Sequence, residues 1–186
     1  HFHIQIIWQS TLLYESTSKE DMKILFKQLG RLTKVALVYG NHENKIKFTK
    51  NKPITKNNIT ILNDQEVHLN NIILIGRSDY TNKSQKKTKD YNLTNKTYNI
   101  VLDHQPQGTR ENIKNNVDLN SVVAPITDKC FHYHSLTTYN PTLRTIAEKK
   151  HTILHKIISS GLVGWGFPIR TVGICQYVVV NVTPDI

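Results

Sequence analysis

The chain has 186 residues, of which 38% are hydrophobic and 8% aromatic, and its formal net charge is +10. This length and composition are ordinary for a soluble globular protein and predict one domain over 1–186. The sequence has no run of about 18 apolar residues and no basic start followed by an apolar stretch, so it predicts neither a membrane span nor a signal peptide. Because Met22 is the only methionine, we expect the natural start to lie upstream of His1.

The positive charge raises the alternative of a polyanion-binding protein, since clustered Lys and Arg bind nucleic acid. The Lys residues are, however, spread along the whole chain, and the densest basic stretch, 82–89, has no aromatic side chain for stacking on bases. A solvated basic surface is the simpler interpretation, and nucleic acid is not expected as a partner. Cys130 and Cys175 lie far apart without a CxxC pattern, which argues against a disulfide framework or a zinc ribbon.

The first elements in chain order are expected to be a strand, a helix and a second strand. A short apolar run at 4–8 is typical of a buried strand. Apolar residues at helical spacing predict a helix that begins after an N-cap at Ser18 and stops at Gly30. The continuous apolar run 35–39 is typical of a strand covered on both faces, and it ends in the polar turn 40–43 (Gly-Asn-His-Glu).

Three short β-rich segments separated by Asn and Asp turns then predict a small meander. They lie at 59–62, 66–69 and 72–75. The polar segment 81–96 has no periodicity and is expected to be an exposed loop. The segment 98–102 is another candidate for a buried strand, and it ends in the turn 103–106 (Asp-His-Gln-Pro). Two buried strands thus each end in a turn that contains a histidine, His42 or His104.

The last third of the chain is mixed in character. No helical or strand periodicity fits 120–145, so we expect irregular structure there. Regular patterning returns at 152–158, followed by a Gly-rich turn at 159–168 and a final strand at 174–182. Strands interspersed with helices and hairpins predict an α/β or mixed α+β sandwich for the chain as a whole.

The Gly-Asn-His-Glu turn combines residue types that are suited to chemistry. Gly40 allows a tight turn, the Asn41 side chain offers a hard oxygen ligand, and His42 can transfer a proton. Taken alone, four such residues are more often an ordinary polar turn, since Gly and Asn dominate turns generally. His104 taken alone is likewise more often a hydrogen-bonded loop histidine.

Taken in order and spacing, four segments resemble blocks of the calcineurin-like metallophosphoesterases, in particular their small bacterial phosphodiesterase-like branch. The segment 38–43 (VYGNHE) resembles the family's GNH[ED] block, and 73–79 (ILIGRSD) is similar to the strand before its GxDD-like turn. The segment 103–106 (DHQP) resembles the metal-binding histidine turn, and 159–170 (SSGLVGWGFPIR) is similar to the C-terminal signature. The resemblance covers nearly all of 12–119 and 151–183.

The resemblance implies a β-sandwich flanked by helices, incomplete at its N-terminus, with two divalent metal ions of the Mn, Fe or Zn class at the C-terminal ends of the strands. It implies hydrolysis of a phosphoester substrate by metal-activated water. Asn41 and His104 would be metal ligands, and His42 would stabilise the transition state or protonate the leaving oxygen. Relatives in this branch often carry an upstream membrane segment, so membrane association and localisation would depend on residues before His1.

Three blocks of the family are missing or altered. The first, Asp-x-His, would lie upstream of His1, and the second, Gly-Asp, falls where 10–11 reads Ser-Thr. The last, Gly-His-x-His, should follow Leu119, but the sequence continues Asn-Ser-Val-Val-Ala. His132 and His134 form an H-x-H farther downstream without the glycine. They are weak candidates for metal ligands, because alternate side chains of an extended segment point to opposite faces.

These departures leave three interpretations open: a metal-dependent phosphoesterase by descent, a non-catalytic remnant or interaction module of that fold, and a basic polyanion-binding protein. A further hypothesis addresses the missing last block. The degeneracy of the genetic code permits a reading of 120–133, taken from the third base of each codon, that is close to the family's GHTHxGQ block. Compensating insertions or deletions near codons 120 and 145 of the gene are therefore predicted, and resequencing tests this.

Overall fold

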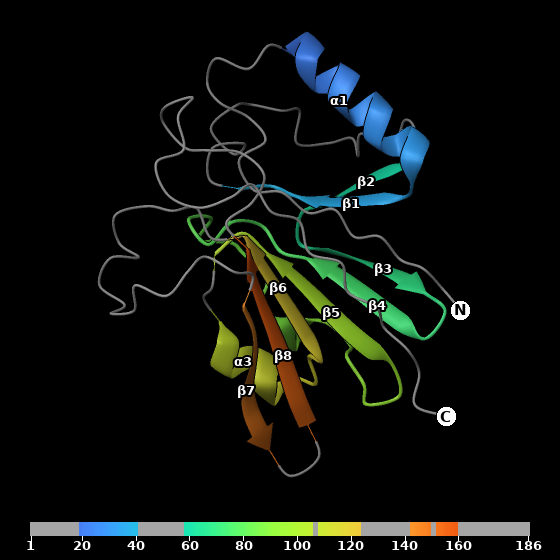
Figure 1. Cartoon of the computed structure of the whole chain (residues 1–186). Coiled ribbons are helices and arrows are strands. Elements are labelled where there is room, and N and C mark those ends of the chain that lie inside the picture. Colours follow the sequence, from blue (N-terminus) through green and yellow to red (C-terminus); the bar gives the residue numbers. More distant parts are fainter. Residues whose placement is uncertain (1–18, 41–57, 106–107, 124–141, 150–151, 160–186) are drawn as a thin grey trace.

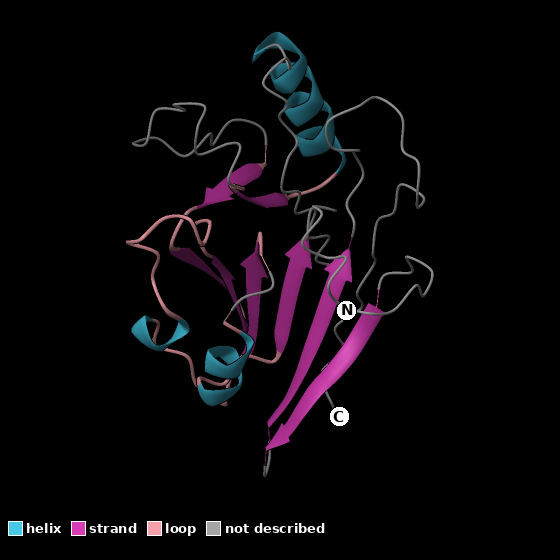
Figure 2. Ribbon diagram, turned by 90° about the vertical axis from the view of Figure 1, so that its left-hand side faces the viewer, coloured by secondary structure: helices cyan, strands magenta, loops and turns pink. Residues whose placement is uncertain are grey.

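The computed structural model describes residues 19–40, 58–105, 108–123, 142–149 and 152–159. The described elements form a mixed α/β structure, which confirms the fold class expected from the sequence at that level. A helix and a two-stranded sheet lie beyond one end of the strands of a six-stranded sheet, and short helices lie beside one face of that larger sheet (Figures 1 and 2). Within the described ranges, none of the helices combines the length and the apolar character that crossing a bilayer requires.

The small sheet consists of β1 (Val35–Val38) and β2 (Ile59–Leu62), which run parallel. Helix α1 (Lys19–Leu32) covers its outer face, where Phe26 and Leu29 pack against strand side chains. The predicted strand after the helix is confirmed. The predicted helix stop at Gly30 is wrong by two residues, because the helix continues to Leu32 while the Gly30 carbonyl accepts a hydrogen bond from the Asn58 side chain at 2.9 Å.

The large sheet has six strands, and its four middle strands β4, β5, β6 and β8 run parallel to one another. The strands β3 and β7 pair antiparallel with β4 and β8 at either side. In spatial order the strands are β3 (Gln65–Leu69), β4 (Ile72–Gly76), β5 (Tyr98–Asp103), β6 (Leu119–Val123), β8 (Thr152–Ser159) and β7 (Thr142–Lys149).

The core lies between the two sheets and continues on the outer face of the large sheet. Val38 and Leu62 of the small sheet pack against a cluster that includes Leu74 and Leu102 of the large one. Successive side chains of a strand point to opposite faces, so Ile75 belongs to a second cluster on the outer face. Helix α3 (Thr109–Lys114) and the 3₁₀ helix η1 (Thr88–Asp90) lie beside that outer cluster. Both faces of β4 and β5 are therefore covered, and β5 confirms the buried strand predicted at 98–102.

Two predictions about the strands are corrected by the structure. The segments 59–62, 66–69 and 72–75 do not form one meander, because β2 pairs with β1 while β3 and β4 form a hairpin in the other sheet. The prediction of irregular structure over 120–145 is wrong at both ends of that range, where β6 and β7 lie. Backbone hydrogen bonds to β5 and β8 hold β6 in place, and such bonds do not require alternating apolar side chains.

The segment 81–96 contains more order than the exposed loop predicted for it. It includes η1, and its residues Thr88 and Tyr91 are buried. The remaining predictions concern residues outside the described ranges. These are the strand 4–8, the N-cap Ser18, the Gly-rich turn from residue 160 onward and the strand 174–182.

Candidate functional site

The carboxyl ends of β1, β2, β4 and β5 meet at one rim, where the two sheets touch. The contact point is Gly76, the last residue of β4, which lies opposite Leu102 of β5. A Cβ atom on Gly76 would overlap the Leu62 side chain and lie 2.7 Å from Cγ1 of Val38. Only a residue without a side chain allows this approach. Figures 1 and 2 accordingly show the arrowheads of the parallel strands pointing toward the small sheet.

The first polar cluster at this rim contains Asp79, His104 and Gln105, and we call it the Asp79 cluster. The side chains of Asp79 and His104 are both fully buried, and Nε2 of His104 lies 3.9 Å from Oδ2 of Asp79. The Gln105 amide donates to the same Oδ2 atom at 3.2 Å. The other oxygen, Oδ1, accepts from the backbone N–H of Thr81 at 2.9 Å and from its hydroxyl. The carboxylate is thereby held in one orientation.

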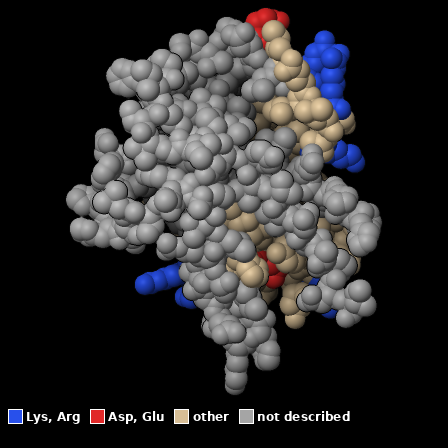
Figure 3. Space-filling model, in the orientation of Figure 1, with Lys and Arg blue, Asp and Glu red and all other residues tan. Residues whose placement is uncertain are grey.

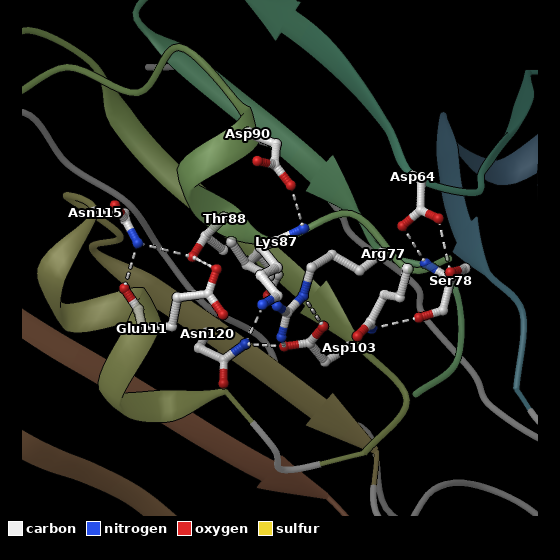
Figure 4. Close-up of polar contacts among 12 residues, drawn as sticks. Asp64, Arg77, Ser78, Lys87, Thr88, Asp90, Asp103, Glu111, Asn115 and Asn120 are labelled. Carbon is white, nitrogen blue, oxygen red and sulfur yellow. Dashed lines mark hydrogen bonds and ion pairs between the residues drawn. The ribbon is translucent and has the colours of Figure 1, made fainter. Parts of the chain in front are cut away.

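The second cluster contains Arg77, Asp103 and Asn120, which point toward one another in Figure 4, and we call it the Arg77 cluster. Arg77 donates from Nε to Oδ1 of Asp103 at 2.6 Å and from Nη2 to Oδ2 at 2.8 Å. Asn120 donates to Oδ2 at 2.8 Å. Burial acts to lower the pKa of Arg77, but the hydrogen bond and the charge of Asp103 raise it overall. Arg77 and Asp103 thus form a buried ion pair joined by two hydrogen bonds.

Neighbouring loops hold these two clusters in place. The backbone N–H and hydroxyl of Ser78 donate to the carboxylate of Asp64 at 3.0 and 2.7 Å, which ties the end of β4 to the turn after β2 (Figure 4). Gly108 precedes α3 with φ +81°, and a Cβ atom there would lie 2.9 Å from Nη2 of Arg77. The chain before α3 thus packs directly against the guanidinium group.

Among the residues predicted to form a site, the structure describes His104. It follows β5 at the rim and is 1% exposed. Asn41, His42, His132 and His134 lie outside the described residues. Gly40, which precedes Asn41, is described and buried, two residues beyond the end of β1.

Sequence reasoning did not single out Arg77, Asp79 or Asn120 as members of a site. For Arg77 and Asp79 a signal was present, since a charged residue directly after a buried strand must find a partner or water. Asn120 gave no such signal, because its role depends on where β6 pairs with β5.

Among the described residues of the rim, His104 is the candidate metal ligand, and these residues do not make up a two-metal centre. Within the part of the chain that the structure describes, no three His, Cys, Asp or Glu residues are grouped closely enough to hold a metal ion. Both oxygens of Asp103 are occupied by Arg77 and Asn120. His104 has the carboxylate of Asp79 beside one ring nitrogen, at 3.9 Å, which is longer than a hydrogen bond.

Basic side chains gather over α1 in Figure 3. Lys23, Lys27 and Arg31 are exposed and follow one another at four-residue spacing along this helix. The opposite side of the helix carries Phe26 and Leu29, which pack on the small sheet. The basic stripe is therefore the solvent face of an amphipathic helix.

Compared with models of protein families, with curated proteins and with solved structures, the chain gives no match. Assignment of a function therefore depends on the residues of the rim and on the motif resemblance.

Proposed function

We propose that this chain is a calcineurin-like metallophosphoesterase domain, a hydrolase of phosphoester bonds that depends on divalent metal ions. The observation that carries the proposal is the shared rim. The ends of β1 and β5 meet around Gly76, and each strand leads within two residues to a turn of the motif. In the sequence, Asn41 directly follows Gly40 and His104 directly follows β5.

In this proposal Asn41 and His104 hold metal, and His42 acts as the acid for the leaving oxygen or stabilises charge in the transition state. Bound divalent ions would supply an activated water and neutralise charge on the phosphoryl group. The closed pair of Arg77 and Asp103 would not bind metal. This ion pair would support the turn that carries His104, because Asp103 directly precedes His104 in the chain.

A specific observation favours a second candidate, a non-catalytic scaffold of the same fold. The carboxylate next to His104 is engaged by an arginine and an asparagine. Ser10 and Thr11 stand where the family has its bridging carboxylate, and a hydroxyl does not replace a carboxylate as a bridge between two metal ions. A scaffold that has lost its ligands would keep the rim without binding ions.

Hydrolysis of bis(4-nitrophenyl) phosphate by the full chain with Mn²⁺ separates these candidates. We expect metal-dependent turnover that a chelator abolishes. His42→Ala should lower it by about 10²–10⁴-fold, as expected for loss of an acid–base group. His68→Ala is the matched control, because His68 is exposed on β3. A folded wild-type chain without metal-dependent turnover would favour the scaffold, and nucleic-acid binding with a steep salt dependence would favour the polyanion-binding alternative.

A further inference from the structure

Asp79 is a buried carboxylate whose hydrogen-bond donors are electrically neutral. Its side chain is fully buried, and its donors are the Thr81 backbone N–H, the Thr81 hydroxyl and the Gln105 amide. Burying a carboxylate is costly unless an opposite charge or several hydrogen bonds compensate for it. Among the described residues, the ring of His104 is an ionisable group beside this carboxylate, with Nε2 at 3.9 Å from Oδ2.

The geometry distinguishes the two nitrogens of this ring. Nε2 faces a carboxylate oxygen, where an N–H group is attracted and a nitrogen lone pair is repelled. Thr81 fixes Oδ1, so the carboxylate cannot turn away from the imidazole without losing two hydrogen bonds. Oδ2 is shared with Gln105, the residue after His104, so one oxygen atom faces two successive residues of the same turn.

We propose that Asp79 is a positioning residue for His104. Its carboxylate keeps the neutral ring in the tautomer with the proton on Nε2 and ties the loop after β4 to the turn after β5. This inference extends the proposed function, in which His104 is a metal ligand, but the tautomer itself does not depend on metal.

Nitrogen-15 NMR of the metal-free full chain with labelled histidine tests the tautomer directly. His104→Gln identifies the His104 signals among the nine histidines by their disappearance. At a pH where the ring is neutral, we expect the proton on Nε2 in the wild type. Asp79→Asn should give a mixture of tautomers, since a neutral amide can either accept from the ring or donate to it. A wild-type ring protonated on Nδ1, or an unchanged tautomer in Asp79→Asn, would overturn the proposal.

A second readout is the affinity for Mn²⁺ measured by calorimetry. Loss of a carboxylate that orients a metal-binding histidine typically lowers metal affinity by about 10–100-fold, and we expect Asp79→Asn to do so. Glu66→Gln is the matched control, because Glu66 contacts His68 at 2.9 Å in an exposed pair on β3. Its affinity and the His104 signals should stay unchanged. If the wild type binds no Mn²⁺, the phosphoesterase proposal fails. The tautomer measured by NMR still tests whether Asp79 positions His104.

Discussion

Asp79 and Asp103 offer a comparison of two buried carboxylates at one rim. Asp103 meets a guanidinium through two hydrogen bonds of 2.6 and 2.8 Å and accepts a third from Asn120. Asp79 has neutral donors and an imidazole at 3.9 Å. The first carboxylate has its charge compensated within the protein. The second depends on a group whose protonation can change.

The two carboxylates therefore differ in what they can do: Asp103 supports a turn, and Asp79 faces a side chain that can take part in chemistry. The two parallel hydrogen bonds between Arg77 and Asp103 fix the geometry of the pair, so the Arg77 cluster holds its turn in place. A carboxylate that faces one nitrogen of an imidazole can orient the ring, so that the other nitrogen points toward a ligand. In the proposed function, the adjacent residues Asp103 and His104 therefore have different roles, support of the turn and metal binding.

The largest effect is expected from Arg77→Met, which leaves Asp103 buried without its cation. Removing one partner of a buried ion pair costs about 3–5 kcal/mol, because the remaining charge is uncompensated. Urea denaturation measures the free energy of unfolding. Arg77→Met combined with Asp103→Leu should recover part of the loss, since the uncompensated charge is then gone. Equal stability of Arg77→Met and the wild type would show that the pair does not hold the rim.

Gly76→Ala tests the contact that brings both clusters to one rim. The added methyl group would overlap Leu62 and press on Val38, so the sheets must move apart. Overpacking of this kind costs about 1–3 kcal/mol. Combined with Leu62→Gly, which removes the Cβ atom that the new methyl group overlaps, Gly76→Ala should cost less than it does in the wild type, so the double variant should be more stable than the sum of the two single losses. Thermal unfolding of the three variants gives the result, and additive effects would contradict the contact.

Asp118 provides a third carboxylate for comparison. It accepts a hydrogen bond of 2.7 Å from the backbone N–H of Asn99. Burial raises its pKa above 3.8, while the Asn99 hydrogen bond and the charge of His155 lower it to a smaller extent. A raised pKa means that the folded state holds the proton more tightly than the unfolded state. The stability contributed by this group is complete below pH 3.8 and is lost as pH rises through the raised pKa.

The wild type should therefore lose stability as pH rises from 3.8 through the raised pKa of Asp118, and Asp118→Asn should not show this loss. The effect is expected to be smaller than that of Arg77→Met. Urea denaturation at several pH values compares the two proteins. Parallel pH profiles of wild type and variant would contradict the raised pKa.

The smallest effect is expected from the exposed pair of Lys23 and Glu20, with a 3.0 Å contact and side chains 72% and 71% exposed. Solvent screens such a pair, so Lys23→Ala should change the free energy of unfolding by less than about 1 kcal/mol. The same denaturation assay applies. A loss as large as that in Arg77→Met would remove the distinction between buried and exposed pairs.

Much of the fold was predictable where apolar patterning is strong. The strand at 35–38 is a continuous apolar run, the strand at 98–103 is mostly apolar, and the helix before the first of them shows a clear period. The segment 59–62 was recognised as a strand but assigned to the wrong partners. Strand pairing depends on where the chain returns in space, and short apolar runs of equal length carry no information about that.

For the site, the residues of the turn at 103–106 were predictable and its supporting partners were not. His104 attracts notice because it follows a buried strand in a polar turn. The roles of Arg77 and Asn120 arise only when β4, β5 and β6 lie side by side, since their contacts with Asp103 span 26 and 17 residues of sequence.

The amino-acid sequence by itself determined the α/β class, the covered strands and the polar turns that follow them, because these depend on local patterns of apolar and polar residues. The tertiary structure decided which strand ends share a rim, which carboxylate is closed by an arginine and which faces a histidine. Those outcomes depend on distances between segments far apart in the chain. Such distances are fixed by the packing of the two sheets around Gly76.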